Sequence, residues 1–387
     1  MHVPMTSRSI LHVIEDLKPE SGGPTTVVVE LARHQARSGA RVSVVCGSGP
    51  DQASQRAQLQ ASFEADGVAL HVLASADRAP SRRRLRELIQ TTGAEVVHLH
   101  GMWSSIVRLG AAEARRAGLP YVIATHGMLH PDVLEQGKWK KRLYLTVFAS
   151  ILGHCGEVLA LNDEERHAIH TRFHRPASVL PNGLEIKRYI ASSSERFRGL
   201  HPELANTSFA LFVGRLHPIK GIDQLLRSFI AARERGLCSH LVVAGPDGGQ
   251  RAELERQVSE ARLSSVVHFI GPVYGDVKIA AFQACSMFVH RPRFEGFGLT
   301  VLEALAAGKP VVTTRRCRLD GAESADALRV TPDTDEGFAE AMVALERDPA
   351  SAAELGARAQ AWVQARFDWS AIAQQALEVY NRVLGRG

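Results

Sequence analysis

Two kinds of segment are missing from the sequence: a membrane helix and a secretion signal. No apolar run approaches the roughly 18 residues that a membrane helix needs, and the longest runs have the length of strands. The first 14 residues do not form a signal peptide, because their short apolar stretch leads into Glu15 and Asp16 instead of a small-residue cleavage site. We therefore expect a cytoplasmic protein.

Cysteine is scarce, and the composition offers no other covalent or metal framework. The five cysteines are scattered, and no two of them form a C-x-x-C pair, which argues against disulfides and against a zinc site. The net charge of +5 suits anionic partners such as nucleotides, diphosphate lipids and acidic membrane surfaces. It is too small to indicate nucleic acid, and the sequence has no zinc finger or arginine-rich arm.

The sequence does contain an alternation of short apolar runs and amphipathic stretches, repeated in two halves. Its 387 residues suffice for about two to three domains. Strands that are apolar throughout and alternate with helices indicate a parallel sheet covered on both faces. The expected strands are residues 10–14, 42–45, 69–73, 96–99, 121–124 and 158–161 in the first half, and 210–213, 241–244, 267–270, 287–289 and 310–314 in the second.

This alternation predicts an α/β protein with two doubly wound, Rossmann-like domains. We place the first at residues 1–189 and the second at 207–367, joined by a polar linker at 190–206. Ligands of doubly wound sheets bind beyond the carboxyl ends of the strands. Two such domains that face each other would form a central cleft, a favoured place for a small molecule. The informative residues are therefore those that directly follow a strand.

The segment HRPRFEGFGLTVLEALAAG, residues 290–308, follows a strand of the second half. In it Glu295 and Glu303 are separated by seven residues, and both can face one pocket. A helix is expected at 299–307, and the glycine-containing stretch before it leaves backbone N–H groups and the positive end of the helix dipole for a diphosphate. The two carboxylates suit the hydroxyls of a sugar and of a ribose.

Three shorter segments also follow strands. Arg215 and Lys220 lie in GRLHPIKG, where two cations can stabilise the charge that develops on a leaving diphosphate without a metal. Gly22 and Gly23 follow the first strand and let the backbone approach a ligand closely. His126 lies in THGM after the fifth strand, from where its ring would point into the cleft.

Together these segments resemble the retaining glycosyltransferase family 4, which has the GT-B fold. The resemblance covers nearly the whole chain, and its most specific signal is the pair of glutamates in order with GRL-x-x-x-K. It implies transfer of a hexose from a nucleotide diphosphate sugar, with retention and without a metal or another cofactor. It further implies that the C-terminal helix, within 368–387, packs back on the first domain. The matching segments are SGGP, THGMLHP, VLPNGLE, LFVGRLHPIKG, LVVAGPDGG, HFIGPV and EGFGLTVLEALAAGKPVV.

The resemblance implies a role for each residue that matches it. Gly22 and Gly23 would belong to a loop that closes over the donor phosphate or the acceptor, and His126 would lie beside the transferred sugar. Arg215 and Lys220 would clamp the diphosphate. Glu295 would meet the sugar hydroxyls, Glu303 the ribose, and Val273 the base. The phosphate and sugar would lie against the backbone of Gly296, Phe297, Gly298 and Leu299.

One stretch departs from the family pattern, and two others have ordinary structural explanations. Where the family usually has a small residue before the first glutamate segment, this chain has His290-Arg291-Pro292-Arg293, and the two arginines either reach the acceptor or face solvent. Asp333 and Asp335 resemble a metal-binding D-x-D, but a helix N-cap explains them better. The basic amphipathic stretch 134–152 either packs on the core or contacts a membrane surface or lipid acceptor.

The sequence thus predicts a metal-independent hexosyltransferase of bacterial polysaccharide biosynthesis. Its acceptor would be a glycan or a polyprenyl-diphosphate-linked glycan, and the enzyme would work in the cytoplasm, with contact to the inner membrane surface as the narrower expectation. Two alternatives remain open: a nucleotide-sugar epimerase of the same fold, and a non-catalytic two-domain sugar-binding protein.

Overall fold

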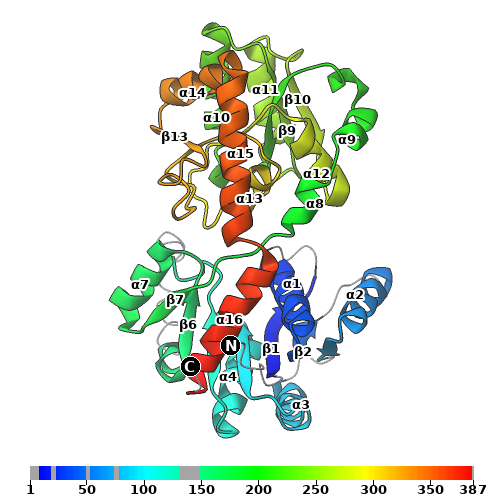
Figure 1. The fold of residues 1–387 in the computed structure, drawn as a ribbon, viewed down its shortest axis with the longest axis vertical. Helices are drawn as coiled ribbons and strands as arrows, with labels where there is room; N and C mark the ends of the chain where they lie inside the picture. Colours follow the sequence, from blue (N-terminus) through cyan, green and yellow to red (C-terminus); the bar gives the residue numbers. More distant parts are fainter. Residues whose placement is uncertain (1–7, 19–22, 49–52, 74–77, 131–147, 386–387) are drawn as a thin grey trace. The chain divides into compact units, whose positions relative to one another are not determined.

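The computed structural model describes residues 8–18, 23–48, 53–73, 78–130 and 148–385, and the chain divides into two compact units. Unit 1 consists of Met1–Gly183 and Trp369–Gly387, and unit 2 of Leu184–Asp368. Each unit is a parallel sheet with helices on both faces (Figure 1). The prediction of two Rossmann-like α/β domains is confirmed.

Unit 1 is built on seven parallel strands within its described residues. In spatial order they are β3 (Ala69–Val72), β2 (Arg41–Ser48), β1 (Ser9–Asp16), β4 (Val96–His100), β5 (Tyr121–Ala124), β6 (Glu157–Ala160) and β7 (Ala177–Val179). Its labelled helices are α1 (Gly23–Arg37), α2 (Ala53–Ala65), α3 (Arg78–Thr91), α4 (Ser105–Arg116), α7 (Asp163–Phe173) and α16 (Trp369–Val383).

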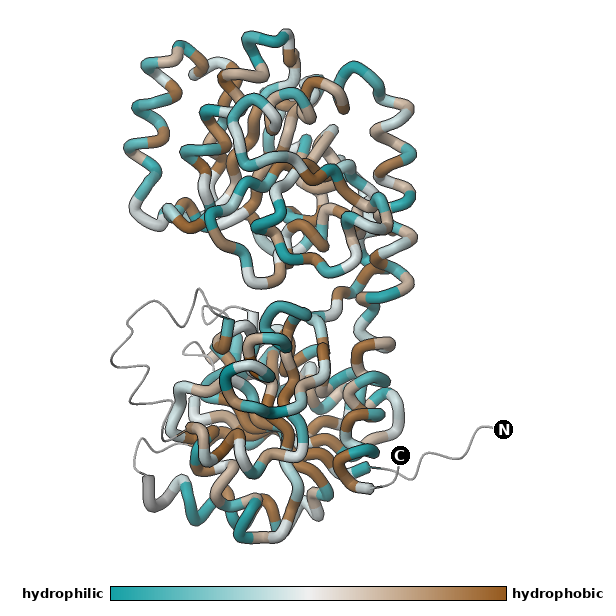
Figure 2. Tube along the Cα trace, turned by 90° about the vertical axis from the view of Figure 1, so that its left-hand side faces the viewer, coloured by the Kyte–Doolittle hydropathy of each residue, from teal (hydrophilic) through white to brown (hydrophobic). Residues whose placement is uncertain are grey.

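The two faces of this sheet carry separate cores, because successive side chains of a strand point to opposite faces. Leu11 and Val13 of β1 lie in a core with residues of α3 and α4. Ile10 and Ile14 lie in the other core with residues of α1 and α16. In Figure 2 the interior strands are mostly brown, whereas teal residues recur along the helices. Apolar burial on both faces explains why these strands are hydrophobic throughout.

Unit 2 is built on six parallel strands. In spatial order they are β10 (Val267–Gly271), β9 (His240–Ala244), β8 (Phe209–Val213), β11 (Met287–His290), β12 (Val311–Thr314) and β13 (Arg329–Thr331). Its helices are α8 (Ile186–Ile190), α9 (Glu195–Leu200), α10 (Ile222–Glu234), α11 (Arg251–Glu260), α12 (Gly275–Ala284), α13 (Leu299–Ala306), α14 (Asp335–Arg347) and α15 (Pro349–Arg366), with short 3-10 turns η2 (Pro202–Leu204) and η3 (Pro218–Lys220).

The structure passes from unit 1 to unit 2 earlier than the expected boundary at 189. The stretch 190–206, expected as a linker, contains α9 and η2 and belongs to unit 2. Phe197 of α9 is fully buried, and α9 packs against α12. The chain returns to unit 1 at Trp369, and α16 packs against α1 in the manner that the family resemblance implied.

Most of the expected basic helix at 134–152 lies outside the described residues, and only 148–154 is seen to be helical. Across the part of the chain that the structure describes, no helix combines the length and the apolar character that a membrane crossing requires.

Candidate functional site

The carboxyl edge of the unit 2 sheet brings together two of the segments that the sequence singled out. Because β8 and β11 are neighbours, the loops that follow them lie side by side. The Nζ atom of Lys220, in the β8 loop, lies 2.5 Å from Oε2 of Glu295, in the β11 loop. Residues that are 75 positions apart in the sequence therefore form one ion pair at the edge predicted to hold the ligand.

Backbone contacts fix these two loops against each other. Gly221 has a φ of +64°, and a Cβ atom there would collide with the carbonyl oxygen of Arg291. The N–H group of Arg293 donates to the carbonyl oxygen of Ile219 at 3.0 Å. The glycine therefore serves both the left-handed turn and the close approach of the loops, and it sets the reach of Lys220.

Glu295 is held as a carboxylate. Burial alone would raise its pKa, but the hydrogen bond from Nε2 of His290 at 3.2 Å and the charge of Lys220 together hold that pKa well below its ordinary value. Burial lowers the pKa of His290, so its ring is neutral and donates through Nε2. His290 stands where the family usually has a small residue, and it is a site residue whose contact with Glu295 the sequence did not reveal.

Glu303 occupies the second turn of α13 and is buried. Its Oε1 atom accepts from the Tyr189 hydroxyl at 2.9 Å and from Nζ of Lys278 at 2.5 Å. Its Oε2 atom is buried without a hydrogen-bond partner in the structure. Buried carboxylate oxygens normally have partners, so one oxygen of Glu303 is fixed by the protein and the other is available for a ligand hydroxyl. Tyr189 and Lys278 were missed in the sequence, because no motif marks them.

The N-terminus of α13 has the features of an anion site. Its N-cap is Gly298, which has a φ of +69° and no side chain to cap the helix, and no acidic residue lies in the first turn. The N–H groups from Leu299 onward point out of the helix end, where the dipole favours negative charge. Phe297 is buried and packs against Phe367, which holds the preceding loop.

The other predicted donor residues of unit 2 also lie in loops that follow strands. Arg215 is exposed, and its guanidinium has no ion-pair partner among the described residues. Gly296 lies between Glu295 and the α13 N-terminus. Val273 is buried between β10 and α12, next to Tyr274, which is 70% exposed. The structure thus joins Lys220 to Glu295, leaves Arg215 open to solvent, and places Glu303 with partners of its own.

In unit 1, His126 follows β5 with a φ of +51°. Its Nε2 atom lies 3.1 Å from Nδ1 of His100, and burial lowers its pKa to about 4. The backbone N–H groups of Gly127 and Leu129 both donate to the buried carboxylate of Glu165 on α7, at 3.2 and 3.1 Å. Glu165 therefore anchors the loop that carries His126, and the sequence gave no sign of it.

The glycine loop is described only in part. Gly23 is the first residue of α1, whereas Gly22 lies outside the described residues.

A cavity of about 10 Å³ in unit 1 is lined by apolar residues and by His98, His100, His126 and Asn182.

Both acids of the D-x-D form ion pairs with arginines, and the two arginines of the segment that departs from the family pattern have acidic partners. Arg291 is buried and donates to both Asp333 and Asp335. Arg293 forms two hydrogen bonds with Asp223, at 2.7 and 2.6 Å. Neither arginine simply faces solvent. The N-cap of α14 is Thr334, so the expectation of an aspartate cap was off by one residue.

A larger cavity, of about 580 Å³, follows β12 and β13. Its wall carries Arg315, which pairs with Glu323 at 2.9 Å, and Arg316, which pairs with Asp333 at 2.7 Å. Apart from Asp333 of the D-x-D, no motif in the sequence marks the residues that line this cavity, which come from the ends of β12 and β13 and the segments that follow them.

Comparison with known proteins agrees with this geometry. The family model for "Glycosyltransferase Family 4" matches residues 21–188, and that for "Glycosyl transferases group 1" matches 194–362. The GDP-mannose:cellobiosyl-diphosphopolyprenol alpha-mannosyltransferase of Xanthomonas campestris is 27% identical, over 97% of this chain and 97% of that relative. A D-inositol 3-phosphate glycosyltransferase of Pseudarthrobacter chlorophenolicus is 25% identical, over 95% of this chain and 92% of that relative.

Solved structures share the fold. HepE of Anabaena, determined in complex with UDP, has a TM-score of 0.77 at 21% identity, over 97% of this chain and 100% of that one. WaaG, a glycosyltransferase involved in lipopolysaccharide biosynthesis, has a TM-score of 0.70 at 18% identity, over 97% of this chain and 100% of that one. The chain therefore belongs to glycosyltransferase family 4, the glycosyl transferases group 1, with the GT-B fold, and it is a hexosyltransferase.

Proposed function

We propose that this enzyme transfers a hexose, with retention and without a metal, from a nucleotide diphosphate sugar to a glycan or a polyprenyl-diphosphate-linked glycan. The observation that carries the proposal is the edge of the unit 2 sheet. It combines the Lys220–Glu295 pair, the exposed Arg215, which has no ion-pair partner in the described part of the chain, and the uncapped N-terminus of α13. Cations and N–H groups at one sheet edge form a site for a diphosphate.

In this proposal Lys220 leaves its ion pair with Glu295 and pairs with the diphosphate of the donor. Lys220, Arg215 and the α13 N–H groups then stabilise the negative charge that grows on the leaving group, which is an electrostatic route to catalysis. Glu295, freed from the ion pair, accepts from hydroxyls of the sugar. Glu303 accepts from a ribose hydroxyl through Oε2, while Tyr189 and Lys278 hold its Oε1.

The reaction that we propose proceeds on one face of the sugar. The bond between the anomeric carbon and the diphosphate oxygen breaks, and the acceptor oxygen forms its bond to the same face of that carbon. The acceptor proton passes to the departing diphosphate. The side-chain cations support a metal-independent reaction because they supply the positive charge that a metal would otherwise provide, and the D-x-D acids are engaged by Arg291 and Arg316.

The acceptor class and the cellular location of the enzyme are inferred from observations outside the edge of the unit 2 sheet. Glu165 and the His100 contact hold His126 in place, and the family resemblance puts this residue beside the transferred sugar. The X. campestris relative acts on a diphosphopolyprenol, which supports a lipid-linked acceptor in polysaccharide biosynthesis. We propose that the enzyme works in the cytoplasm, at the membrane surface where such lipids lie.

The experiment that tests this proposal is a transfer assay with nucleotide sugars and polyprenyl-diphosphate glycans, run with and without EDTA. We expect an α-configured donor to give an α-linked product at the same rate in both conditions. An inverted product, or activity lost with EDTA and restored by a divalent ion, would contradict it. A parallel reaction without acceptor distinguishes transfer from epimerisation, since an epimerase would change the donor sugar without any acceptor.

A further inference from the structure

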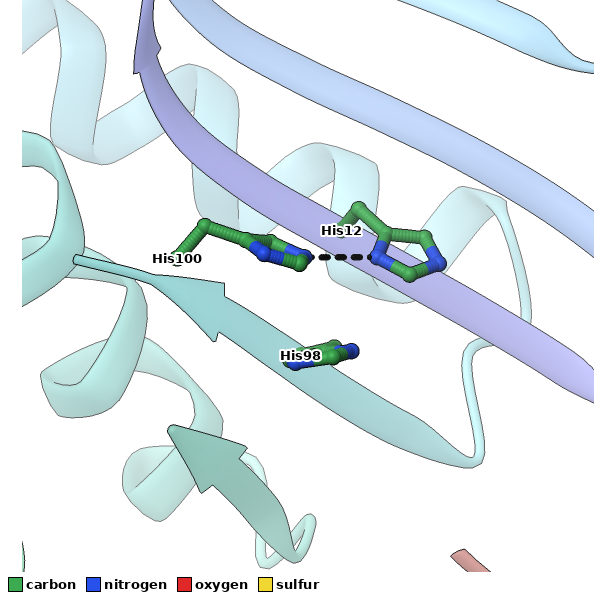
Figure 3. Close-up of side chains that lie close together, drawn as sticks. All are labelled: His12, His98 and His100. Atoms are coloured by element: carbon green, nitrogen blue, oxygen red, sulfur yellow. Dashed lines mark hydrogen bonds between the residues drawn. The ribbon is translucent and has the colours of Figure 1, made fainter. Parts of the chain in front are cut away.

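A chain of buried polar side chains lies on the face of the unit 1 sheet that α1 and α16 cover. His12 of β1 and His98 and His100 of β4 point to this face and are fully or almost fully buried (Figure 3). The surrounding core is otherwise apolar. Burying so many polar groups is costly unless they form hydrogen bonds with one another.

The first half of the chain starts at His126 and runs inward. Nε2 of His126 lies 3.1 Å from Nδ1 of His100. Nε2 of His100 lies 2.9 Å from Nδ1 of His12, the contact drawn as a dashed line in Figure 3. Nε2 of His12 lies 2.7 Å from Oε1 of Gln35 on α1. His100 and His12 each use both ring nitrogens: one contacts the preceding ring, and the other contacts the next group in the chain.

The second half joins α1 to α16. Nε2 of Gln35 donates to the Tyr380 hydroxyl at 3.0 Å. That hydroxyl lies 2.6 Å from Nδ1 of His98. Tyr380 is fully buried, so both of its hydrogen-bond partners are protein groups. The chain thus connects the loop that carries His126 to the C-terminal helix.

His12, His98 and His100 also form a cluster with metal-ligand chemistry, the only group of three or more such residues close enough to share an ion among the residues that the structure describes. The ring geometry does not suit an ion. The rings of His98 and His100 are stacked, with centroids 4.0 Å apart and planes 29° apart, so their lone pairs run side by side instead of converging. In addition, Nδ1 of His12 and Nε2 of His100 are hydrogen-bonded to each other.

All four rings are neutral. Burial lowers the pKa of His12 and of His126 to about 4. Burial first, and the neighbouring rings second, hold the pKa of His98 and of His100 well below the ordinary value. A neutral imidazole donates through one nitrogen and accepts through the other. The nitrogen that carries the proton on one ring therefore determines which nitrogen carries the proton on the next ring.

Tyr380 sets the direction of this chain. Burial raises the pKa of its phenol, which keeps its proton. The contact to His98 is 2.6 Å, a length typical of an O–H donor, whereas the contact from Gln35 is 3.0 Å, typical of an N–H donor. The hydroxyl therefore donates to His98 and accepts from the Gln35 amide nitrogen. This leaves the amide oxygen of Gln35 facing His12.

The protons of the remaining rings follow from this direction. His12 must donate through Nε2 to the Gln35 oxygen, so its Nδ1 accepts from Nε2 of His100. Nδ1 of His100 then accepts from Nε2 of His126. Nδ1 of His126, which has no hydrogen-bond partner in the described structure, keeps a free lone pair.

We propose that Gln35 and Tyr380 are positioning residues that act through His12 and His100 to fix His126 in the tautomer protonated at Nε2. His126 then presents an acceptor nitrogen, Nδ1, to a hydroxyl of the substrate. This proposal rests on the proposed function, which places His126 beside the transferred sugar. It adds a specificity rule: the site prefers a sugar with a hydroxyl at that position over the deoxy analogue, because the deoxy analogue cannot form the hydrogen bond to Nδ1 of His126.

The test is a long-range ¹H–¹⁵N spectrum of the full chain with ¹⁵N-labelled histidines, which shows which ring nitrogen carries the proton. We expect His126, His100 and His12 all to be protonated at Nε2. Gln35→Met removes the group that orients His12 and should convert the His126 signal to a mixture of tautomers. Tyr380→Phe, which keeps the ring and its packing, should do the same by freeing the Gln35 amide to turn.

The protein supplies an internal control. His240 and His268 form a partly buried ring pair in unit 2, with Nδ1 and Nε2 2.9 Å apart, and their signals should not change in either variant. His126 protonated at Nδ1 in the unaltered chain would overturn the proposal, as would a His126 signal that stays unchanged in both variants. We also expect kcat to fall by roughly tenfold in Gln35→Met, the effect of one misplaced hydrogen bond. The expected spectra with no sugar transfer would contradict the proposed function while leaving the relay intact.

Discussion

The two candidate site regions hold their polar groups in opposite ways. At the edge of unit 2 the buried and partly buried groups are charged and paired: Lys220 with Glu295, and Lys278 with Glu303. In unit 1 a chain of four histidines is kept neutral. A charged diphosphate needs opposite charge, which is strong in a partly buried site. A sugar hydroxyl needs only a correctly placed acceptor. The comparison suggests that unit 2 supplies electrostatic stabilisation and unit 1 supplies orientation.

The largest effect should come from the charged side of this comparison. Lys220→Ala removes one cation from the proposed diphosphate site and should lower kcat by roughly 100- to 1,000-fold, the usual effect of losing one preorganised charge stabiliser. Steady-state kinetics with the preferred donor measures this. Lys187→Ala, an exposed lysine of the same unit, is the matched control and should keep full activity. Near-normal turnover in Lys220→Ala would remove Lys220 from the mechanism.

The neutral histidines of unit 1 should make the stability of the protein depend on pH. The pKa of His12 and of His126 is about 4 in the folded state and about 6.5 unfolded, so between these values the unfolded chain binds more protons. Stability should therefore fall as the pH drops from about 6.5 to about 4, by up to about 1.4 kcal/mol per pH unit for each such histidine.

Glu295 acts in the same sense but in a lower pH window, because its pKa is also lowered, from the lower ordinary value of a carboxyl group. Its contribution to stability is complete above its unfolded pKa and is lost only at still lower pH. In unit 2, among the described residues, only His290 is a fully buried histidine with a lowered pKa, so calorimetry should show the transition of unit 1 moving further than that of unit 2. Equal shifts of both transitions would contradict the contrast.

A smaller effect is expected at Glu303. Tyr189→Phe removes the hydroxyl that holds Oε1 of Glu303 and should raise the KM for the donor by roughly tenfold, as for a hydrogen bond to a charged group. Tyr121→Phe is the matched control, since it removes a buried phenol bond at 2.7 Å in unit 1. Both variants should lose similar stability, and only Tyr189→Phe should change KM. An unchanged KM would separate Glu303 from donor binding.

The smallest effect is expected at Arg293. This arginine is exposed and pairs with Asp223, so Arg293→Ala should cost less than about 1 kcal/mol of stability and leave kinetics with donor and acceptor unchanged. Thermal unfolding and acceptor titration measure the two quantities. A large rise in the KM for the acceptor would show instead that Arg293 reaches the acceptor.

The central elements of the fold were predictable from the sequence, whereas its margins were not. The apolar runs of β1, β4, β8 and β11 are buried on both faces, so composition alone marks them. The edge strands β7 and β13 have three residues each and carry no such signal. The stretch 190–206 was expected as a linker because it is polar, but the buried side chains of Phe197 and Leu204 anchor it to unit 2.

The site was predictable where a motif follows a strand and hidden where a contact forms across the fold. Lys220 and Glu295 were found because sheet topology brings strand ends together. Tyr189, Lys278 and Glu165 lie on helices, far in sequence from the residues they bond, and no local pattern connects them. For the same reason the link from His126 to Tyr380, 254 positions away, appears only in three dimensions.

The most direct test of the central claim is calorimetric binding of nucleoside diphosphates with EDTA present, to the unaltered protein and to Arg215→Ala. Arg215 has no ion-pair partner among the described residues, so its loss should weaken binding without destabilising the fold. We expect binding of one nucleotide type that survives EDTA and weakens by roughly tenfold or more in the variant. Binding that requires a divalent ion, or that is the same in both proteins, would contradict a metal-free diphosphate site at this edge of unit 2.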